Sequence, residues 1–355
     1  MGSTGGSGIR IGVYGLNHPH AGGHFRDLDT VAGIATVLVS DADAQAAKDK
    51  AASLERGAYY DGGWEAMLAD DDIPAVCLLT DNRAAGRLTR EAMECGKWVY
   101  ADKPGAATAA DMEAIVATGE RTGTYFCPCY ARRSYEDTAK MCELVHGGAL
   151  GEIWSFQAVW STSQVRLRGP ENWLFDHEYA GGGIVYWLAC HWLDNLRLLT
   201  RSRIAAVSAM TANMTPGVDV EEVVCANLRL ENGAIGSLRA GYLRDPYLRY
   251  DEADLMMSLE GADGSLSCLY HEGGPTLRLR SKAPGFEYAA EGALIGLAQK
   301  RPDGGYAPLF LGGFLEALEN GSEPPATQHD ALYVLKVAEA IYEAASSGTE
   351  QKISW

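Results

Sequence analysis

The chain has 355 residues, of which 47% are hydrophobic and 22% are charged, so it can bury the cores of two ordinary globular domains. Its 47 acidic residues outnumber 30 lysines and arginines and give a net charge of −17. This charge repels phosphate backbones and anionic membrane surfaces, and no basic patch interrupts it. We therefore expect neither a nucleic-acid partner nor a membrane partner.

The start of the chain, its apolar stretches and its cysteines bear on the location of the protein. Residues 1–8 are small and polar, which predicts a disordered tail without the features of a secretory signal. No stretch approaches the roughly 18 apolar residues of a spanning helix. The eight cysteines are scattered, and Cys127 and Cys129 lack the spacing of a zinc finger. We expect reduced thiols and a cytoplasmic protein.

The first third of the chain alternates apolar runs with helical patterns. The runs predict strands at residues 9–14, 35–40, 75–80 and 98–101, and the patterns between them predict helices at 19–31, 42–55, 64–69 and 83–95. This alternation is typical of a Rossmann fold, a doubly wound parallel sheet. We expect a dinucleotide-binding domain over residues 9–126.

Such sheets bind ligands just outside the carboxyl ends of their strands. Asp41 lies where a carboxylate can accept hydrogen bonds from the adenosine ribose and repel a 2′-phosphate, which favours NAD over NADP. The alternative is that Asp41 only caps the following helix. The residues that we expect to contact the cofactor are Gly15, Asn17, His18, Asp41, Thr80, Asn82, Asp102 and Lys103.

The expected phosphate loop departs from the G-x-G-x-x-G pattern because it keeps only the first glycine, Gly15. Asn17 can adopt a positive φ, and backbone amides at the helix start could still face a pyrophosphate. His18, His20 and His24 suggest a metal site, since the last two share a helix face. No carboxylate or cysteine is obviously placed to complete it, so we expect no metal.

Several stretches carry a resemblance to one known family. They are Asp102-Lys103-Pro104 after residues 94–100, two arginines at the end of residues 129–133, residues 148–153, Ala180-Gly181-Gly182-Gly183 followed by His191-x-x-Asp194, and residues 314–325. In this order they resemble the glucose-fructose oxidoreductase and inositol dehydrogenase family, Gfo/Idh/MocA, from residue 9 to the C-terminus.

The resemblance implies a C-terminal domain, residues 127–355, built on a large and mostly antiparallel open sheet. The sequence agrees, since turn signals separate expected strands at residues 152–162, 204–210, 221–230, 234–242, 254–259, 265–270 and 276–280. Helices would cover one face of this sheet and a second subunit the other. The resemblance thus implies a homo-oligomer, a dimer or tetramer, formed through the sheet.

Lys103 follows a strand and His191 lies in a helix expected over residues 184–199, and together they make a plausible proton-handling pair. The resemblance implies hydride transfer between NAD and a secondary hydroxyl of a sugar, inositol or related polyol. His191 would act as general base, and Lys103 would polarise the same oxygen. The alternative for His191 is a structural histidine capped by Asp194.

The family usually has an aspartate four residues before this histidine, where this chain has Trp187. Asp176 or His177 could supply the missing acid. The departure leaves two alternatives open: a non-catalytic regulator that binds nucleotide or sugar, and an NAD-dependent glycosidase. The residues that we expect to contact substrate are Arg132, Arg133, Trp160, Arg166, Arg168, Trp173, Trp187 and Asp194.

Overall fold

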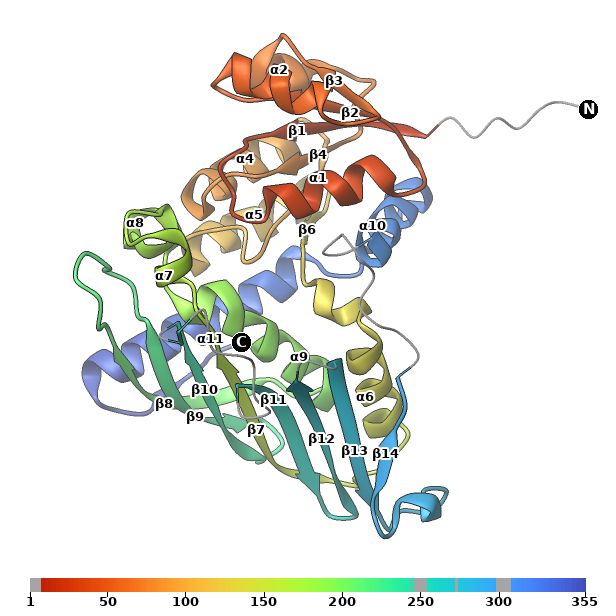
Figure 1. Ribbon diagram of the computed structural model, residues 1–355, viewed down its shortest axis with the longest axis vertical. Coiled ribbons are helices and arrows are strands. Elements are labelled where there is room, and N and C mark those ends of the chain that lie inside the picture. The colour runs from red at the N-terminus through yellow and green to blue at the C-terminus, as the bar shows by residue number, and fades with distance from the viewer. Residues whose placement is uncertain (1–7, 243, 246–253, 272–273, 298–307) are drawn as a thin grey trace, which may run out of the picture. The chain divides into compact units, whose positions relative to one another are not determined.

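The computed structural model describes residues 8–242, 244–245, 254–271, 274–297 and 308–355. It divides into two compact units (Figure 1). The first contains the chain up to Ala131 together with Asp303–Leu332, and the second contains Arg132–Pro302 together with Tyr333–Trp355. The domain division that the sequence suggested, after residue 126, remains a prediction.

The first unit is built on a six-stranded sheet with the order β3-β2-β1-β4-β5-β6. All of its strand pairs are parallel, which confirms the doubly wound sheet. The strand order reverses between β1 and β4, so the expected binding position lies beyond Tyr14 and Leu78. The strands are β1 (Ile9–Tyr14), β2 (Ile34–Ser40), β3 (Gly57–Tyr59), β4 (Ala75–Leu78), β5 (Trp98–Ala101) and β6 (Phe126–Pro128).

Helices cover this sheet, and one of them comes from near the end of the chain. The rings of Trp98 and Tyr100 on β5 lie 6.2 and 5.4 Å from that of Phe314 on α10. Helix α10 also packs against α1, so this C-terminal segment completes the core of the first unit. The helices are α1 (Ala21–Thr30), α2 (Ala44–Ala52), α3 (Gly63–Ala69), α4 (Asn82–Glu94), α5 (Ala109–Thr122) and α10 (Pro308–Asn320).

The second unit is built on a nine-stranded sheet with the order β14-β13-β12-β11-β7-β10-β9-β8-β15. Its strand pairs are antiparallel except β7 with β10, which confirms the mostly antiparallel sheet. The strands are β7 (Ile153–Ser161), β8 (Ile204–Ala212), β9 (Val223–Leu230), β10 (Ile235–Gly241), β11 (Leu255–Gly261), β12 (Gly264–His271), β13 (Gly274–Ser281), β14 (Ala293–Ile295) and β15 (Gln351–Lys352).

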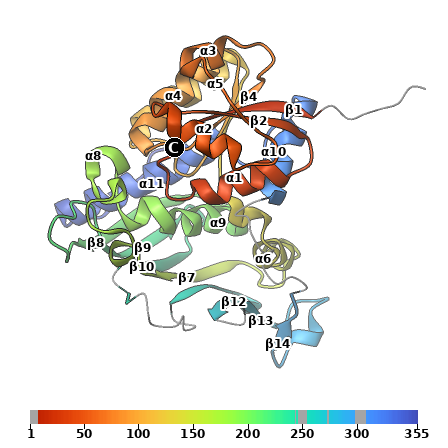
Figure 2. The ribbon, with the colours of Figure 1, turned by 45° about the horizontal axis from the view of Figure 1, so that its top comes forward.

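Helices α6 and α9 lie over one face of this sheet (Figure 2). Covering one face of a sheet buries every second residue of a strand. Strand β9 has this pattern, because its buried Val224, Ala226 and Leu228 alternate with exposed residues. The helices are α6 (Glu136–His146), α7 (Val165–Arg168), α8 (His177–Ala180), α9 (Cys190–Thr200) and α11 (Gln328–Ser347), which continues from the first unit. Among the described helices, none combines the length and apolar character needed to cross a membrane.

Candidate functional site

Gly15 follows β1 in a conformation that requires glycine. Its φ is +93°, and a Cβ atom there would lie 2.5 Å from Thr80 Cγ2 and 2.9 Å from the Leu79 carbonyl oxygen. Its N–H donates to the Ser40 carbonyl at the end of β2. Gly15 therefore keeps the tight turn that the first glycine of a dinucleotide loop provides, and the residues here fit that role.

The amides of the expected phosphate loop are largely used within the protein. The N–H of His18 donates to the Leu79 carbonyl at 3.1 Å, and that of Ala21 donates to the His18 carbonyl at 2.9 Å. The N–H of His20 donates to His18 Nδ1 at 3.2 Å. These residues form a turn, so α1 begins at Ala21 and not at residue 19 as expected. The loop offers an anion fewer amides than a glycine-rich loop does.

Asp41 lies directly after β2, as expected for a ribose contact, and accepts a hydrogen bond from the Asp43 N–H at 2.8 Å. The residue that caps α2 is Asp43, whose carboxylate accepts from Gln45 and Ala46. The alternative that Asp41 is the helix cap is therefore wrong. The cap falls two residues later because α2 begins at Ala44.

Thr80, Asp81 and Asn82 follow β4 at the point where the strand order reverses. The Asp81 carboxylate accepts from the Ala84 N–H at 2.8 Å and caps α4. Asn82 is the first residue of that helix and is buried, and the hydroxyl of Thr80 donates to the Asp81 carbonyl. Both expected cofactor contacts, Thr80 and Asn82, thus lie at the carboxyl edge of the sheet.

Asp102 and Lys103 follow β5 and are almost fully buried. Asp102 Oδ2 lies 2.8 Å from His20 Nδ1, 2.8 Å from His24 Nε2 and 3.9 Å from His18 Nδ1. The other oxygen, Oδ1, accepts from the Lys103 N–H and lies 3.4 Å from Lys103 Nζ. No carboxylate was expected beside the three histidines, and Asp102 occupies that position.

The charges of this cluster are coupled. Burial raises the pKa of Asp102, but His20, Lys103 and His18 outweigh it and hold that pKa well below its usual value. Burial lowers the pKa values of His18 and His20, although Asp102 acts in the opposite direction. The Asp102 carboxylate is therefore ionised near neutral pH.

In the second unit, Glu221 holds the start of the histidine-bearing segment. Its carboxylate accepts hydrogen bonds from the Gly183 N–H at 2.7 Å, the Val185 N–H at 2.9 Å and the Tyr342 hydroxyl at 2.9 Å. Burial raises the pKa of Glu221 to about 7. Sequence reasoning assigned Glu221 only to a strand and missed this contact, because the bonded groups lie far apart in the chain.

The helix expected over residues 184–199 is not uniform. Val185–Ala189 form a π-helix, and α9 begins at Cys190. The expected α-helix is therefore interrupted before His191, because sequence patterns do not reveal a π-helix.

Trp187 and Arg168, both expected to contact substrate, share one neighbour. The indole N–H of Trp187 donates to Gln164 Oε1 at 3.3 Å, and Arg168 Nε donates to the same oxygen at 2.8 Å. The Arg168 guanidinium lies 5.8 Å from the centre of the Trp187 ring. Gln164, which the sequence analysis did not select, thus orients both side chains.

His191 is buried, with 9% of its surface exposed. Its ring stacks on that of Trp160, with centres 5.8 Å apart and planes 23° apart. Three residues further on, Asp194 accepts two hydrogen bonds from Arg133, at 2.5 and 2.8 Å. The structure therefore groups Trp160 with His191, and Asp194 with Arg133.

Arg132 is enclosed by the second unit's own side chains. Its guanidinium lies 4.5 Å from the Trp192 ring centre and 4.8 Å from that of Tyr270. One of its nitrogens lies 3.3 Å from Asp137, and the Tyr270 hydroxyl bonds to both Arg132 and Asp137. These contacts indicate a structural contribution from Arg132, and its expected contact with substrate stays a prediction.

The remaining candidates lie on short helices. Arg166 on α7 forms an exposed ion pair with Asp245 at 2.8 Å. Trp173 begins a 3-10 turn, Trp173–Phe175, and is partly exposed. Asp176 caps α8, and His177 is the exposed first residue of that helix. The structure gives Asp176 a capping role, and a catalytic role for either residue stays a prediction.

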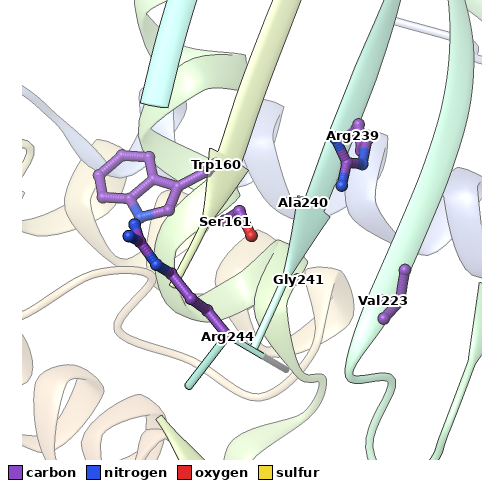
Figure 3. Close-up of a pocket in the computed structure, with 7 residues that line it drawn as sticks. All are labelled: Trp160, Ser161, Val223, Arg239, Ala240, Gly241 and Arg244. Atoms are coloured by element: carbon purple, nitrogen blue, oxygen red, sulfur yellow. The ribbon is translucent and has the colours of Figure 1, made fainter. Parts of the chain in front are cut away.

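A pocket of about 300 Å³ opens at the ends of β7 and β10. Trp160 lines it and also stacks on His191. Arg244 points toward the Trp160 ring in Figure 3 and forms an ion pair with Asp254. The volume is at the lower end of the range for small-molecule sites. The lining residues are Trp160, Ser161, Val223, Arg239, Ala240, Gly241 and Arg244.

Comparisons with known proteins agree with this architecture. The chain is 24% identical to levoglucosan dehydrogenase of Pseudarthrobacter phenanthrenivorans, over 57% of either chain. It is 24% identical to 1,5-anhydro-D-fructose reductase of Ensifer adhaerens, over 85% of this chain and 89% of that protein. A solved levoglucosan dehydrogenase in complex with NADH has the same fold, with a TM-score of 0.86 and 20% identity over 98% of this chain and 100% of the other.

Two family descriptions match most of the chain. Residues 9–128 match an oxidoreductase family with an NAD-binding Rossmann fold, and residues 138–267 match the GFO/IDH/MocA C-terminal domain. The two matches fall on the parallel sheet and on much of the antiparallel sheet. The chain therefore belongs to the Gfo/Idh/MocA family of oxidoreductases, and its relatives include sugar and polyol dehydrogenases.

Proposed function

We propose that the protein oxidises a secondary hydroxyl of a sugar, inositol or related polyol, reversibly and with NAD as hydride acceptor. The observation that carries this proposal is the environment of the two expected proton-handling groups in a chain of this family. Lys103 is buried with its Nζ 3.4 Å from Asp102, and buried His191 stacks on Trp160. Each group is held in place by a neighbour, as acid–base chemistry requires.

The chemistry divides between cofactor and protein. Bound NAD supplies a hydride acceptor at C4 of its nicotinamide. His191 accepts the proton of the substrate hydroxyl, and Lys103 donates a hydrogen bond to the same oxygen. Oxidation thus yields a carbonyl compound and NADH, and in the reverse direction His191 returns the proton.

For the cofactor, we propose contacts from the residues at the carboxyl edge of the parallel sheet. Gly15 supports the turn below the pyrophosphate, and Asp41 accepts hydrogen bonds from the ribose hydroxyls and repels a 2′-phosphate. This arrangement favours NAD over NADP. The further cofactor contacts that we propose are Asn17, His18, Thr80, Asn82, Asp102 and Lys103.

For the substrate, aromatic faces and guanidinium groups suit sugar rings and their hydroxyls. The pocket beside Trp160 supports this proposal, because that ring also contacts His191. We propose substrate contacts from Arg132, Trp160, Arg168, Trp173, Trp187 and Asp194.

We also propose a homo-oligomer, a dimer or tetramer, formed through the antiparallel sheet. Met210 on β8 and Ile235 on β10 leave 80% and 51% of their surface exposed, which supports an interface there. The eight cysteines, all within the described residues, form no disulfide, which supports the cytoplasm as a reducing location. Gel filtration with light scattering tests the assembly, and a monomer at all concentrations would contradict it.

A non-catalytic regulator of the same fold is the second candidate, and one observation favours it. The amides of His18, His20 and Ala21 are engaged within the protein, so the loop has fewer donors for a pyrophosphate. Incubating the purified protein with NAD and a panel of sugars and polyols separates the two functions. Dehydrogenation predicts NADH formation, regulation predicts binding without turnover, and glycosidase activity predicts aglycone release without net NADH.

A further inference from the structure

We infer that His18, His20 and Asp102 form a binding site for a divalent transition-metal ion, with His24 holding Asp102 in position. All four residues belong to the first unit. The inference does not depend on the proposed dehydrogenase activity.

The geometry suits a metal ion. One ligand atom from each of His18, His20 and Asp102 lies within 4.8 Å of the other two. Ligands of a tetrahedral zinc ion, with bonds of about 2.0–2.1 Å, lie roughly 3.3 Å from one another. The distances from Asp102 Oδ2 are 2.8 Å to His20 Nδ1 and 3.9 Å to His18 Nδ1, on either side of that value. Shifts of about half an ångström would bring both distances from Asp102 to the value of a tetrahedral site.

The ligand types also suit a metal ion. Two imidazoles and one carboxylate are ligands that zinc, cobalt and ferrous iron share, whereas magnesium and calcium prefer oxygen ligands.

Two contacts within the cluster weaken the binding of a metal ion. His18 Nδ1 accepts the His20 N–H, and this hydrogen bond breaks if Nδ1 ligates the ion. Lys103 Nζ lies 3.4 Å from the other oxygen of Asp102, so its charge repels a cation. Asp102 Oδ1 also accepts the Lys103 N–H, which keeps Oδ2 directed at the histidines. We therefore expect selective binding of ions that prefer nitrogen ligands.

His24 is a positioning residue in this arrangement. Its Nε2 lies 2.8 Å from Asp102 Oδ2, and it is buried on the first turns of α1. Partners of this kind orient a ligating carboxylate, and their loss typically costs about 10–100-fold in metal affinity. An ion bound here would link the segment after β1 to Asp102, the residue after β5. The segment after β1 is the loop that lacks two of the usual glycines.

The test uses the full chain, purified without a histidine tag or chelator and without NAD. Elemental analysis should find one ion per chain, or one Co²⁺ ion should bind after addition and give the visible absorption bands of a nitrogen-ligated site. His20→Ala should weaken Co²⁺ binding at least about 100-fold, and His24→Ala about 10–100-fold. His329→Ala, which changes an exposed histidine of the same unit, is the matched control and should bind normally.

Two results would overturn the inference. One is a native chain that takes up no Co²⁺ or Zn²⁺, which needs no variant to interpret. The other is a folded His20→Ala, shown by circular dichroism, that binds Co²⁺ as the native chain does. Because the readout is metal content and absorption, failure of the proposed dehydrogenase activity leaves this test unaffected.

Discussion

Asp102 and Glu221 are both buried carboxylates, one in each unit, yet their pKa values are shifted in opposite directions. Asp102 has imidazoles and an ammonium group as neighbours, and these hold its pKa well below normal despite burial. Glu221 is surrounded by neutral donors, and burial raises its pKa to about 7. Burial alone therefore does not decide whether a carboxylate is charged. The charge of its neighbours does.

The surroundings of Asp102 and Glu221 also suit these two carboxylates to different roles. Around Asp102 the groups are ionisable and lie at the carboxyl edge of a parallel sheet, where ligands bind. Around Glu221 the partners are two backbone amides and a hydroxyl. The hydrogen bonds from the two amides to Glu221 fix the start of the segment that leads to His191. The first arrangement suits binding and proton transfer, and the second suits support.

The largest expected effect concerns the two proposed proton-handling residues, Lys103 and His191. Lys103→Met and His191→Ala should each lower kcat by about 10²–10⁴-fold, because each removes a group that assists proton transfer. Steady-state NADH formation on the best substrate of the panel measures this. Lys140→Met, which removes only a partly exposed ion pair with Glu143, should leave kcat unchanged. Turnover that survives both catalytic substitutions would refute the assignment.

The comparison of the carboxylates is tested most directly by Glu221→Gln. Because the folded protein holds the Glu221 proton up to about pH 7, and the unfolded chain releases it near 4.5, the native state binds more protons in between. This group makes the free energy of unfolding fall as pH rises through that window, by up to about 3 kcal/mol. Glutamine cannot titrate and should remove the slope.

Urea unfolding at several pH values across the window measures that slope. Glu287→Gln is the control, because the Gly285 N–H lowers the pKa of Glu287 below its usual value of 4.5. The contribution of Glu287 is present above this value and is lost as pH falls, so the slope between about 4.5 and about 7 should persist in Glu287→Gln. An unchanged slope in Glu221→Gln would show that Glu221 titrates normally.

A smaller effect is expected at Gly15, which we propose supports the turn below the cofactor. Gly15→Ala should cost about 1–3 kcal/mol of stability, because of the positive φ and the contacts of the added Cβ with Thr80 and Leu79. Gly22→Ala on α1 meets nothing within 4 Å and should be neutral or slightly stabilising. Thermal unfolding compares them, and equal melting temperatures would contradict the argument.

The smallest effect is expected at Asp41. Asp41→Ala removes the proposed ribose contact and its repulsion of a 2′-phosphate, so the preference for NADH over NADPH should fall about tenfold. Titration with each reduced cofactor, followed by its fluorescence, measures the two dissociation constants. A ratio that does not change would place the ribose elsewhere.

Sequence reasoning succeeded where structure is local. The buried run that forms β5 was predicted with its observed bounds, Trp98–Ala101, because apolar residues and turn signals delimit it. The parallel sheet followed from the alternation of elements in the first unit. The mostly antiparallel sheet was implied by the family resemblance, with which the turn signals agree. The π-helix Val185–Ala189 was missed, since its residues are compatible with an α-helix.

The candidate site was predictable only in part, for a physical reason. Lys103, Asp41 and Gly15 follow strands, and the fold fixes where strand ends lie. The pairing of His24 with Asp102 joins residues 78 apart in sequence, and that of Gly183 with Glu221 joins residues 38 apart. Such contacts arise from tertiary packing, which no local pattern reports.

Isotope transfer tests the central claim most directly. A polyol substrate labelled with deuterium on its carbinol carbon is incubated with the protein and NAD, and the NADH formed is analysed by mass spectrometry. Direct hydride transfer predicts one deuterium at C4 of the nicotinamide and a slower reaction than with the unlabelled substrate. NADH without deuterium, or no NADH with any sugar or polyol while NAD binds, would contradict the proposed dehydrogenase.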